Sequence, residues 1–154
     1  MDGETAARLQ FLWAAGTRPY EQLSQKAAEL PPAARARILP FIEDMGAAYA
    51  AADAVLCRAG SASLAEAAAW GLPMIAVPYP WAADDHQRLN ARYFAQQGAA
   101  VLVEEKDFSV QTAMSAIRRA LLDSTSAEAM KAASKRLARP DAAERLARLV
   151  LEGI

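Results

Sequence analysis

A strand followed by a glycine turn and a helix is the feature that most constrains this chain. The apolar segment 54–57 is predicted to be a short strand, Gly60 marks a turn, and an almost wholly apolar helix is predicted from Ser63 to Trp70. The first N–H groups of a helix have no internal partner and carry partial positive charge. This order therefore predicts an anion site, where small side chains from Gly60 onward would let a diphosphate approach the backbone.

The single acid in this helix admits two interpretations. Glu66 is the only charged residue between Arg58 and Asp84, and in nucleotide-binding α/β folds an acid beyond the phosphate turn often holds the ribose hydroxyls. A lone carboxylate on so apolar a helix also calls for a partner, because an unpaired buried charge is costly. The spacing Ser63-x-x-Glu66 equally fits a capping box, in which Glu66 returns to the Ser63 N–H. The spacing alone leaves both interpretations open.

Strand and helix patterns alternate through the first hundred residues. Strands are expected at 9–16, 36–39, 54–57, 74–77 and 99–103, with helices between them, and the first strand is expected to be buried. Such alternation is typical of an α/β fold with a Rossmann-like parallel sheet. After residue 105 the pattern becomes entirely helical, which predicts a helical C-terminal tail. The length of 154 residues favours a single domain, residues 1–154.

The composition of the chain argues against several kinds of partner and metal site. A net charge of −1 gives no electrostatic reason to expect a nucleic-acid partner. Cys57 is the only cysteine, so multi-cysteine zinc sites are excluded, and we expect it to be a small buried hydrophobe rather than a catalytic thiol. His86 is the only histidine, so no histidine cluster can hold a metal. The acidic start of the chain lacks an apolar signal region, which favours a cytoplasmic protein.

Four segments carry a family resemblance through their order and spacing. They are PFIEDM at 40–45, CRAGS at 57–61, EAAAWGLP at 66–73, and HQ at 86–87 followed by NA at 90–91. Together they resemble the bacterial MurG family, the undecaprenyl-diphospho-muramoylpentapeptide N-acetylglucosaminyltransferases of peptidoglycan synthesis. That family has a GT-B fold, in which two Rossmann-like domains enclose the substrate cleft. The chain resembles most of the C-terminal, sugar-nucleotide-binding domain.

The resemblance also implies the site residues. The backbone of Ile42 would meet the uracil, Glu66 would hold the ribose hydroxyls, and His86 and Gln87 would contact the N-acetylglucosamine hydroxyls. The residues that would surround the diphosphate are Ser61, Ala62, Ser63, Leu64 and Ala65. In this context we prefer ligand binding to capping for Glu66. For His86 we prefer a sugar contact to a metal ligand or a general base. The resemblance implies no metal, no cofactor and no catalytic residue in this chain.

The chain departs from the family pattern in two places. The family's opening strand, with its glycine-serine-rich turn, is not found before Leu9, and the N-terminal domain that carries acceptor recognition and the proposed base is absent. We therefore expect an incomplete sugar-nucleotide-binding domain that does not turn over alone. The lipid-linked acceptor would be bound by a missing N-terminal domain or by a partner chain.

Two functions follow from the resemblance. The first is binding of UDP-N-acetylglucosamine and transfer of its sugar to the lipid-linked muramoyl-pentapeptide, the step from lipid I to lipid II. The alternative is a non-catalytic sugar-nucleotide-binding subunit of a split two-chain glycosyltransferase. The expected location is cytoplasmic, with peripheral association at the inner face of the cell membrane left open.

Overall fold

The computed structural model describes residues 3–30 and 35–153, which form two compact parts divided after Ala51. Strands and helices alternate in both parts, and every paired strand is parallel. The predicted α/β class with a parallel sheet is therefore confirmed.

The first part is a two-stranded parallel sheet with short helices. Its elements are α1 (Gly3–Arg8), β1 (Gln10–Ala14), α2 (Tyr20–Ala28), β2 (Arg35–Leu39) and α3 (Met45–Ala50). The register places Gln10 opposite Arg35 and Ala14 opposite Leu39. Helix α3 begins after Asp44, whose carboxylate accepts a hydrogen bond from the Ala47 N–H at 2.8 Å.

The prediction that the first strand is buried is wrong. All five residues of β1 are exposed, and the side chains of Phe11, Leu12 and Trp13 are 44–50% exposed. Both strands of a two-stranded sheet are edge strands, and α2 packs mainly on β2. An apolar strand is buried only where another layer covers it, and the sequence of the strand does not encode that layer.

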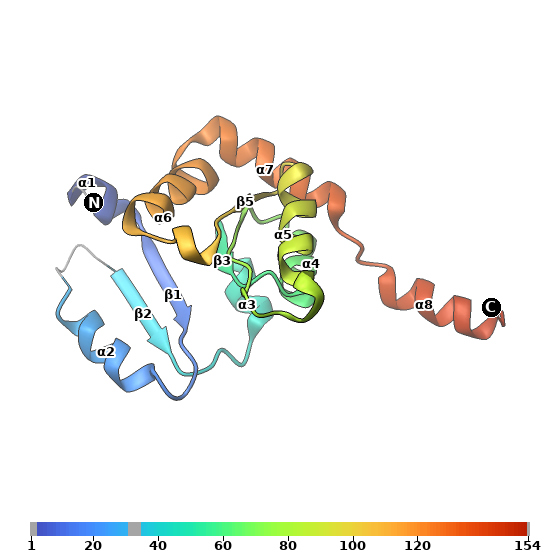
Figure 1. Cartoon of the computed structure of the whole chain (residues 1–154), viewed down its shortest axis with the longest axis horizontal. Helices are drawn as coiled ribbons and strands as arrows, with labels where there is room; N and C mark the ends of the chain where they lie inside the picture. Colours follow the sequence, from blue (N-terminus) through green and yellow to red (C-terminus); the bar gives the residue numbers. More distant parts are fainter. Residues whose placement is uncertain (1–2, 31–34, 154) are drawn as a thin grey trace. The chain divides into compact units, whose positions relative to one another are not determined.

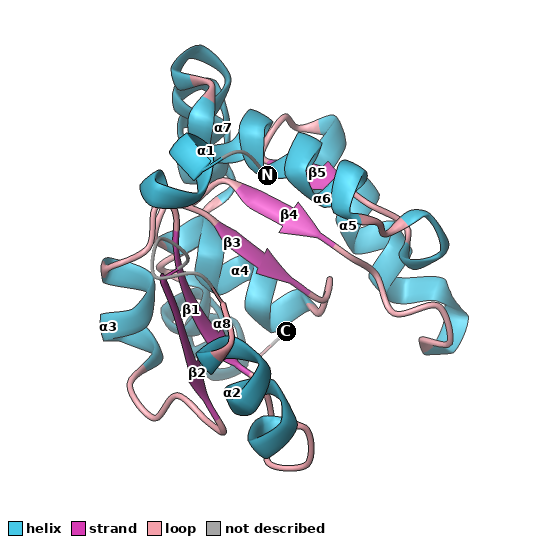
Figure 2. Cartoon of the chain, turned by 90° about the vertical axis from the view of Figure 1, so that its left-hand side faces the viewer, coloured by secondary structure: helices cyan, strands magenta, loops and turns pink. Residues whose placement is uncertain are grey.

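The second part is a three-stranded parallel sheet covered by helices. Its strands are β3 (Val55–Cys57), β4 (Met74–Ala76) and β5 (Ala100–Leu102), in the order β3-β4-β5, and Figure 2 shows β3 and β4 running in the same direction. Its α-helices are α4 (Ser61–Ala69), α5 (His86–Gln96), α6 (Val110–Ile117), α7 (Ser124–Leu137) and α8 (Ala142–Leu151). The short helices are η1 (Ala83–Asp85), η2 (Glu105–Asp107) and the π-helix η3 (Arg118–Leu122).

Strand β4 is the centre of the hydrophobic core, as its continuous apolar run predicts. Successive side chains of a strand point to opposite faces. Met74 and Ala76 pack in one cluster with residues of α4 and α5, whereas Ile75 and Val77 pack in another with residues of α6 and η3. Helix α7 contributes to both clusters. The sheet of this part is therefore a middle layer with helices on both faces.

Every helix or strand described after residue 109 is a helix, so the predicted helical tail is confirmed. Its last helix, α8, projects away from the other elements of the second part (Figure 1), and it has no buried residue. Leu146 and Val150 on this helix are 63% and 71% exposed. Among the described residues, no helix has the length and apolar character needed to cross a membrane.

Glycine at position 71 ends α4. Gly71 has φ +68°, its N–H donates to Ala68, and the N–H of Leu72 donates to Ala67. These two bonds form a Schellman motif, which favours glycine at the left-handed position. The chain then enters β4 directly, and the buried Ser134 hydroxyl of α7 donates to the Leu72 carbonyl at 2.8 Å.

Candidate functional site

Helix α4 begins two residues earlier than predicted. Gly60 is extended at φ −65° and ψ 142° and precedes the first helical residue, Ser61. Ser63 is therefore the third residue of the helix and not its N-cap, so the Ser63–Glu66 capping box does not start α4. Serine is common both at the N-cap and inside the first turn, and for this reason the sequence did not reveal the earlier start.

The start of α4 presents a set of accessible backbone donors. The first hydrogen bond of the helix runs from the Leu64 N–H to the Gly60 carbonyl at 3.1 Å. Helix geometry leaves the N–H groups of Ser61, Ala62 and Ser63 without an acceptor inside the helix. Ser61 and Ala62 are exposed and Ser63 is half-buried, whereas the Leu64 side chain is fully buried in the core. The buried Leu64 side chain thus anchors the first turn of α4, which carries the three N–H donors.

Glu66 lies one turn further along α4 and is exposed to solvent, as is its neighbour Ala65. An apolar helix in sequence still has an exposed face, and Glu66 occupies that face.

Arg58 joins the carboxyl ends of all three strands of the second part. It follows β3, its Nη1 is paired with the Glu105 carboxylate after β5, and the same nitrogen reaches the Pro78 carbonyl after β4 at 3.5 Å. Its guanidinium also lies over the Tyr79 ring, 5.6 Å from the centroid. Ligands of α/β proteins bind beyond this edge of the sheet. Arg58 therefore fixes the loops that border the candidate site.

Asn90 brings α5 to the turn that precedes α4. Its side-chain amide donates to the Ala59 carbonyl at 3.1 Å. Gln87 lies three residues earlier on α5, a spacing that places the two side chains on the same side of the helix. The structure thus brings the predicted sugar contacts at the start of α5 together with the predicted diphosphate contacts at the start of α4.

The predicted sugar contacts are held by the loop before α5. The Gln87 side-chain oxygen accepts a hydrogen bond from the Tyr79 N–H at 3.0 Å. His86 Nδ1 lies 2.7 Å from the Ala83 carbonyl. Asp84 and Asp85 both have positive φ, at 51° and 54°, an uncommon conformation for residues other than glycine that clusters at functional sites.

Two ion pairs of Arg88 support this strained loop. Arg88 on the first turn of α5 lies 3.3 Å from the Asp85 carboxylate and 3.1 Å from the Glu104 carboxylate. Asp85 is the residue directly before α5, and Glu104 follows β5. The start of α5 is consequently tied to the same edge of the sheet as Arg58.

Cys57 occupies the end of β3 and packs against the core cluster of α4 and β4. Burial raises the pKa of the Cys57 thiol to about 11. A reactive cysteine requires a lowered pKa. The thiol is therefore a packing group, as the sequence analysis expected.

Ile42 lies in the first part of the chain, in the loop between β2 and α3, and is half-buried beside the exposed Phe41. The remaining predicted site residues all belong to the second part. Their mutual positions are defined by the contacts of Asn90 and Gln87, whereas the predicted contact of Ile42 with a base stays a prediction.

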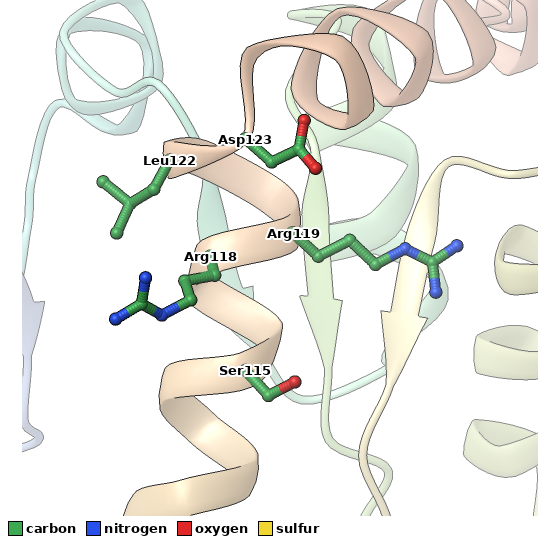
Figure 3. A pocket seen from close by; sticks show the side chains of 5 residues that line it. All are labelled: Ser115, Arg118, Arg119, Leu122 and Asp123. Atoms are coloured by element: carbon green, nitrogen blue, oxygen red, sulfur yellow. The ribbon is translucent and has the colours of Figure 1, made fainter.

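A shallow pocket on α6 and η3 lies outside this constellation. It is lined by Ser115, Arg118, Arg119, Leu122 and Asp123. Figure 3 shows the Arg118 and Arg119 side chains extending to opposite sides of the helix, so the two guanidinium groups do not converge on one point. Asp123 caps α7 by accepting from the Ser126 N–H at 3.0 Å. The pocket has no convergent polar groups and is not a candidate active site.

Sequence reasoning assigned no role to Arg58, Tyr79 or Asn90. Arg58 and Asn90 stand inside the segments that carry the family resemblance, and that was the available signal. Their partners lie 47 and 31 residues away along the chain. In the described part of the chain, no group of three or more His, Cys, Asp or Glu residues could hold a metal ion.

The model of the glycosyltransferase family 28 C-terminal domain matches residues 2–146. The chain belongs to this family. The match spans both parts of the structure and includes every site residue named above.

Curated relatives extend well beyond this domain. Over 144 residues the chain is 42% identical to the "UDP-N-acetylglucosamine--N-acetylmuramyl-(pentapeptide) pyrophosphoryl-undecaprenol N-acetylglucosamine transferase" of Burkholderia mallei, and 41% identical to the protein of the same name from Burkholderia thailandensis. The alignment covers 92% of this chain and 39% of each relative. This family 28 domain therefore spans about two fifths of the length of these relatives.

Solved structures show the same fold. The crystal structure of Acinetobacter baumannii MurG superposes with a TM-score of 0.81 at 28% identity, covering 97% of this chain and 44% of that one. The spinosyn forosaminyltransferase SpnP superposes with a TM-score of 0.55 at 15% identity, a likeness of fold alone. The architecture is that of the C-terminal half of a GT-B glycosyltransferase.

Proposed function

We propose that this family 28 domain binds UDP-N-acetylglucosamine as the donor-binding half of an N-acetylglucosaminyltransferase. In this proposal the acceptor is the lipid-linked muramoyl-pentapeptide, and the two parts of the chain act as one sugar-nucleotide-binding domain. The acceptor would be held by an N-terminal domain or a partner chain. The enzyme would act in the cytoplasm at the inner face of the cell membrane.

One observation carries the proposal: the hydrogen bond from Asn90 to Ala59 places the start of α5 beside the donor-bearing turn of α4. The N–H groups of Ser61, Ala62 and Ser63 suit a diphosphate, because backbone donors at a helix N-terminus bind anions. Gln87 and Glu66 flank that position on α5 and α4. The names of the relatives, which state a UDP-N-acetylglucosamine donor, support the choice of ligand.

The Glu66 carboxylate is the residue through which this proposal is tested. Removing a charged acceptor of ribose hydroxyls should weaken binding by about 1.5–3 kcal/mol. We expect Glu66→Ala to lose that much affinity for both UDP and UDP-N-acetylglucosamine in calorimetric titration. Glu128→Ala, on the exposed side of α7, is the matched control and should leave both affinities unchanged.

Two results would contradict the proposal in different ways. Absence of UDP binding to the parent chain would remove the nucleotide site itself. Equal UDP affinity in the parent chain and Glu66→Ala would remove Glu66 from the site while leaving the α4 turn in place.

A further inference from the structure

Two aromatic rings stand exposed on the loop between β4 and α5. Tyr79 and Trp81 meet edge to face, with ring centroids 5.5 Å apart and planes at 65°. Trp81 is 76% exposed and Tyr79 is 43% exposed. The core contacts that usually bury a tryptophan are missing at this position. An exposed aromatic pair at the ligand edge of a sheet is a feature of binding surfaces.

The pair is held in place rather than left loose. The Arg58 guanidinium lies over the Tyr79 ring, and its pairing with Glu105 fixes the guanidinium in turn. Pro78 and Pro80 flank Tyr79 and restrict the backbone on both sides. Tyr79 is therefore held in its exposed orientation before any ligand arrives, and Trp81 packs against it, which lowers the entropic cost of binding.

Tyr79 also connects the rings to the amide of Gln87. Because the Gln87 side-chain oxygen accepts the Tyr79 N–H at 3.0 Å, its NH₂ group remains as the donor for a ligand. An aromatic face next to an amide donor matches the chemistry of a pyranose. The C–H face of the sugar is apolar with slightly positive hydrogens, which suits the negative face of an aromatic ring, and its hydroxyls accept hydrogen bonds.

We propose that Trp81, supported by Tyr79, is the stacking platform for the pyranose ring of the bound sugar nucleotide. The proposal rests on the proposed function, since it assigns the sugar half of the same ligand. Trp81 is a positioning residue: it contacts the sugar face while Gln87 binds a hydroxyl. The uridine diphosphate half of the ligand does not reach it.

The test compares UDP-N-acetylglucosamine with UDP as calorimetric probes of the full chain. We expect Trp81→Ala to lower the affinity for UDP-N-acetylglucosamine about three- to tenfold, on the scale of one aromatic stacking contact. The affinity for UDP should stay within about twofold. Trp81→Phe should restore most of the loss, since it keeps an aromatic face. Trp70→Ala, which removes a 48% exposed tryptophan at the end of α4, is the control and should change neither affinity.

Each result decides one question. Unchanged affinity of Trp81→Ala for UDP-N-acetylglucosamine, with UDP still bound, overturns the platform and leaves the proposed function intact. Equal losses for both probes also overturn it, because the role would then be structural. A parent chain that binds neither probe overturns the proposed function and the platform together.

Discussion

The side-chain amide of Asn90 donates a 3.1 Å hydrogen bond to the carbonyl of Ala59, and this bond fixes the distance between the starts of two helices. Ala59 is fully buried and lies in the turn before α4. Asn90 lies on the first turns of α5, one turn beyond Gln87. The Asn90–Ala59 bond thus connects the backbone donors of α4, which are proposed to bind an anion, to the Gln87 amide of α5, which is proposed to bind a sugar. Neither Asn90 nor Ala59 is proposed to touch the ligand.

Removal of this bond should therefore affect both stability and binding. Asn90→Ala leaves the buried Ala59 carbonyl without its donor, which costs about 1–3 kcal/mol of unfolding free energy. Urea denaturation measures this loss. Binding of UDP should also weaken, because the turn before α4 loses its support. Gln96→Ala, on the exposed end of α5, should change neither quantity. A fully stable Asn90→Ala variant would mean that the bond does not support the turn.

Substitution by alanine should destabilise the chain at Gly71 but hardly at Gly60. An added Cβ at Gly71 would sit 2.7 Å from the Lys135 stem, and the backbone there has φ +68°. We expect Gly71→Ala to lose about 1–2 kcal/mol of stability, the cost of the left-handed conformation for a residue with a Cβ. Thermal or urea unfolding measures it directly.

Gly60 has open space around its Cβ position, with nothing within 4 Å, and an ordinary φ of −65°. In Gly60→Ala, alanine caps the helix less well than glycine, but it also lowers the conformational entropy of the unfolded chain. These two effects offset each other, so the free energy of unfolding should change by about 0.5 kcal/mol or less. If a diphosphate lies against this turn, Gly60→Ala should nevertheless weaken UDP binding. A variant with parental affinity would show that the ligand does not approach Gly60 closely.

Local patterns predicted the elements, and long-range contacts explain what they missed. The run at Met74 was predicted correctly as a buried strand because helices cover both faces of β4. The equally apolar Phe11 and Trp13 are half-exposed, because both strands of their two-stranded sheet are edge strands. The N-cap of α4 is Gly60 and not the predicted Ser63. The start of this helix therefore depends on backbone conformation and not on the capping preference of serine.

The Cys57 thiol should be unreactive at neutral pH. Its pKa is raised from 9.0 to about 11 by burial, so the folded chain holds the proton through a pH range in which the unfolded chain releases it. Stability is fully present below pH 9 and declines as the pH rises from about 9 toward 11. At pH 9 we expect iodoacetamide to alkylate the native chain roughly 20- to 50-fold more slowly than the urea-unfolded chain. Since Cys57 is the only cysteine, the label reports this site alone. Equal rates in both states would contradict the burial of the thiol.

The last prediction concerns catalysis by the 154-residue chain alone. Glycosyl transfer needs an acceptor hydroxyl in line with the anomeric carbon and a base within hydrogen-bond reach. The family resemblance assigns Glu66, His86 and Gln87 to the donor. Arg58 and Arg88 are both engaged in ion pairs at the edge of the sheet. None of these five side chains, in the described part of the chain, is therefore left to hold a lipid-linked acceptor.

We therefore expect the purified chain to bind UDP-N-acetylglucosamine without transferring its sugar. The assay follows radiolabelled N-acetylglucosamine from the nucleotide to the lipid-linked muramoyl-pentapeptide, with a complete Burkholderia relative as the positive control. Transfer should appear when an N-terminal domain of such a relative is added in trans, because that domain would supply the acceptor site and the base. The Glu66→Ala chain should then restore less activity than the parent chain at the same concentration. Turnover by the chain alone at the rate of the complete enzyme would show that the acceptor site and the base both lie within these residues.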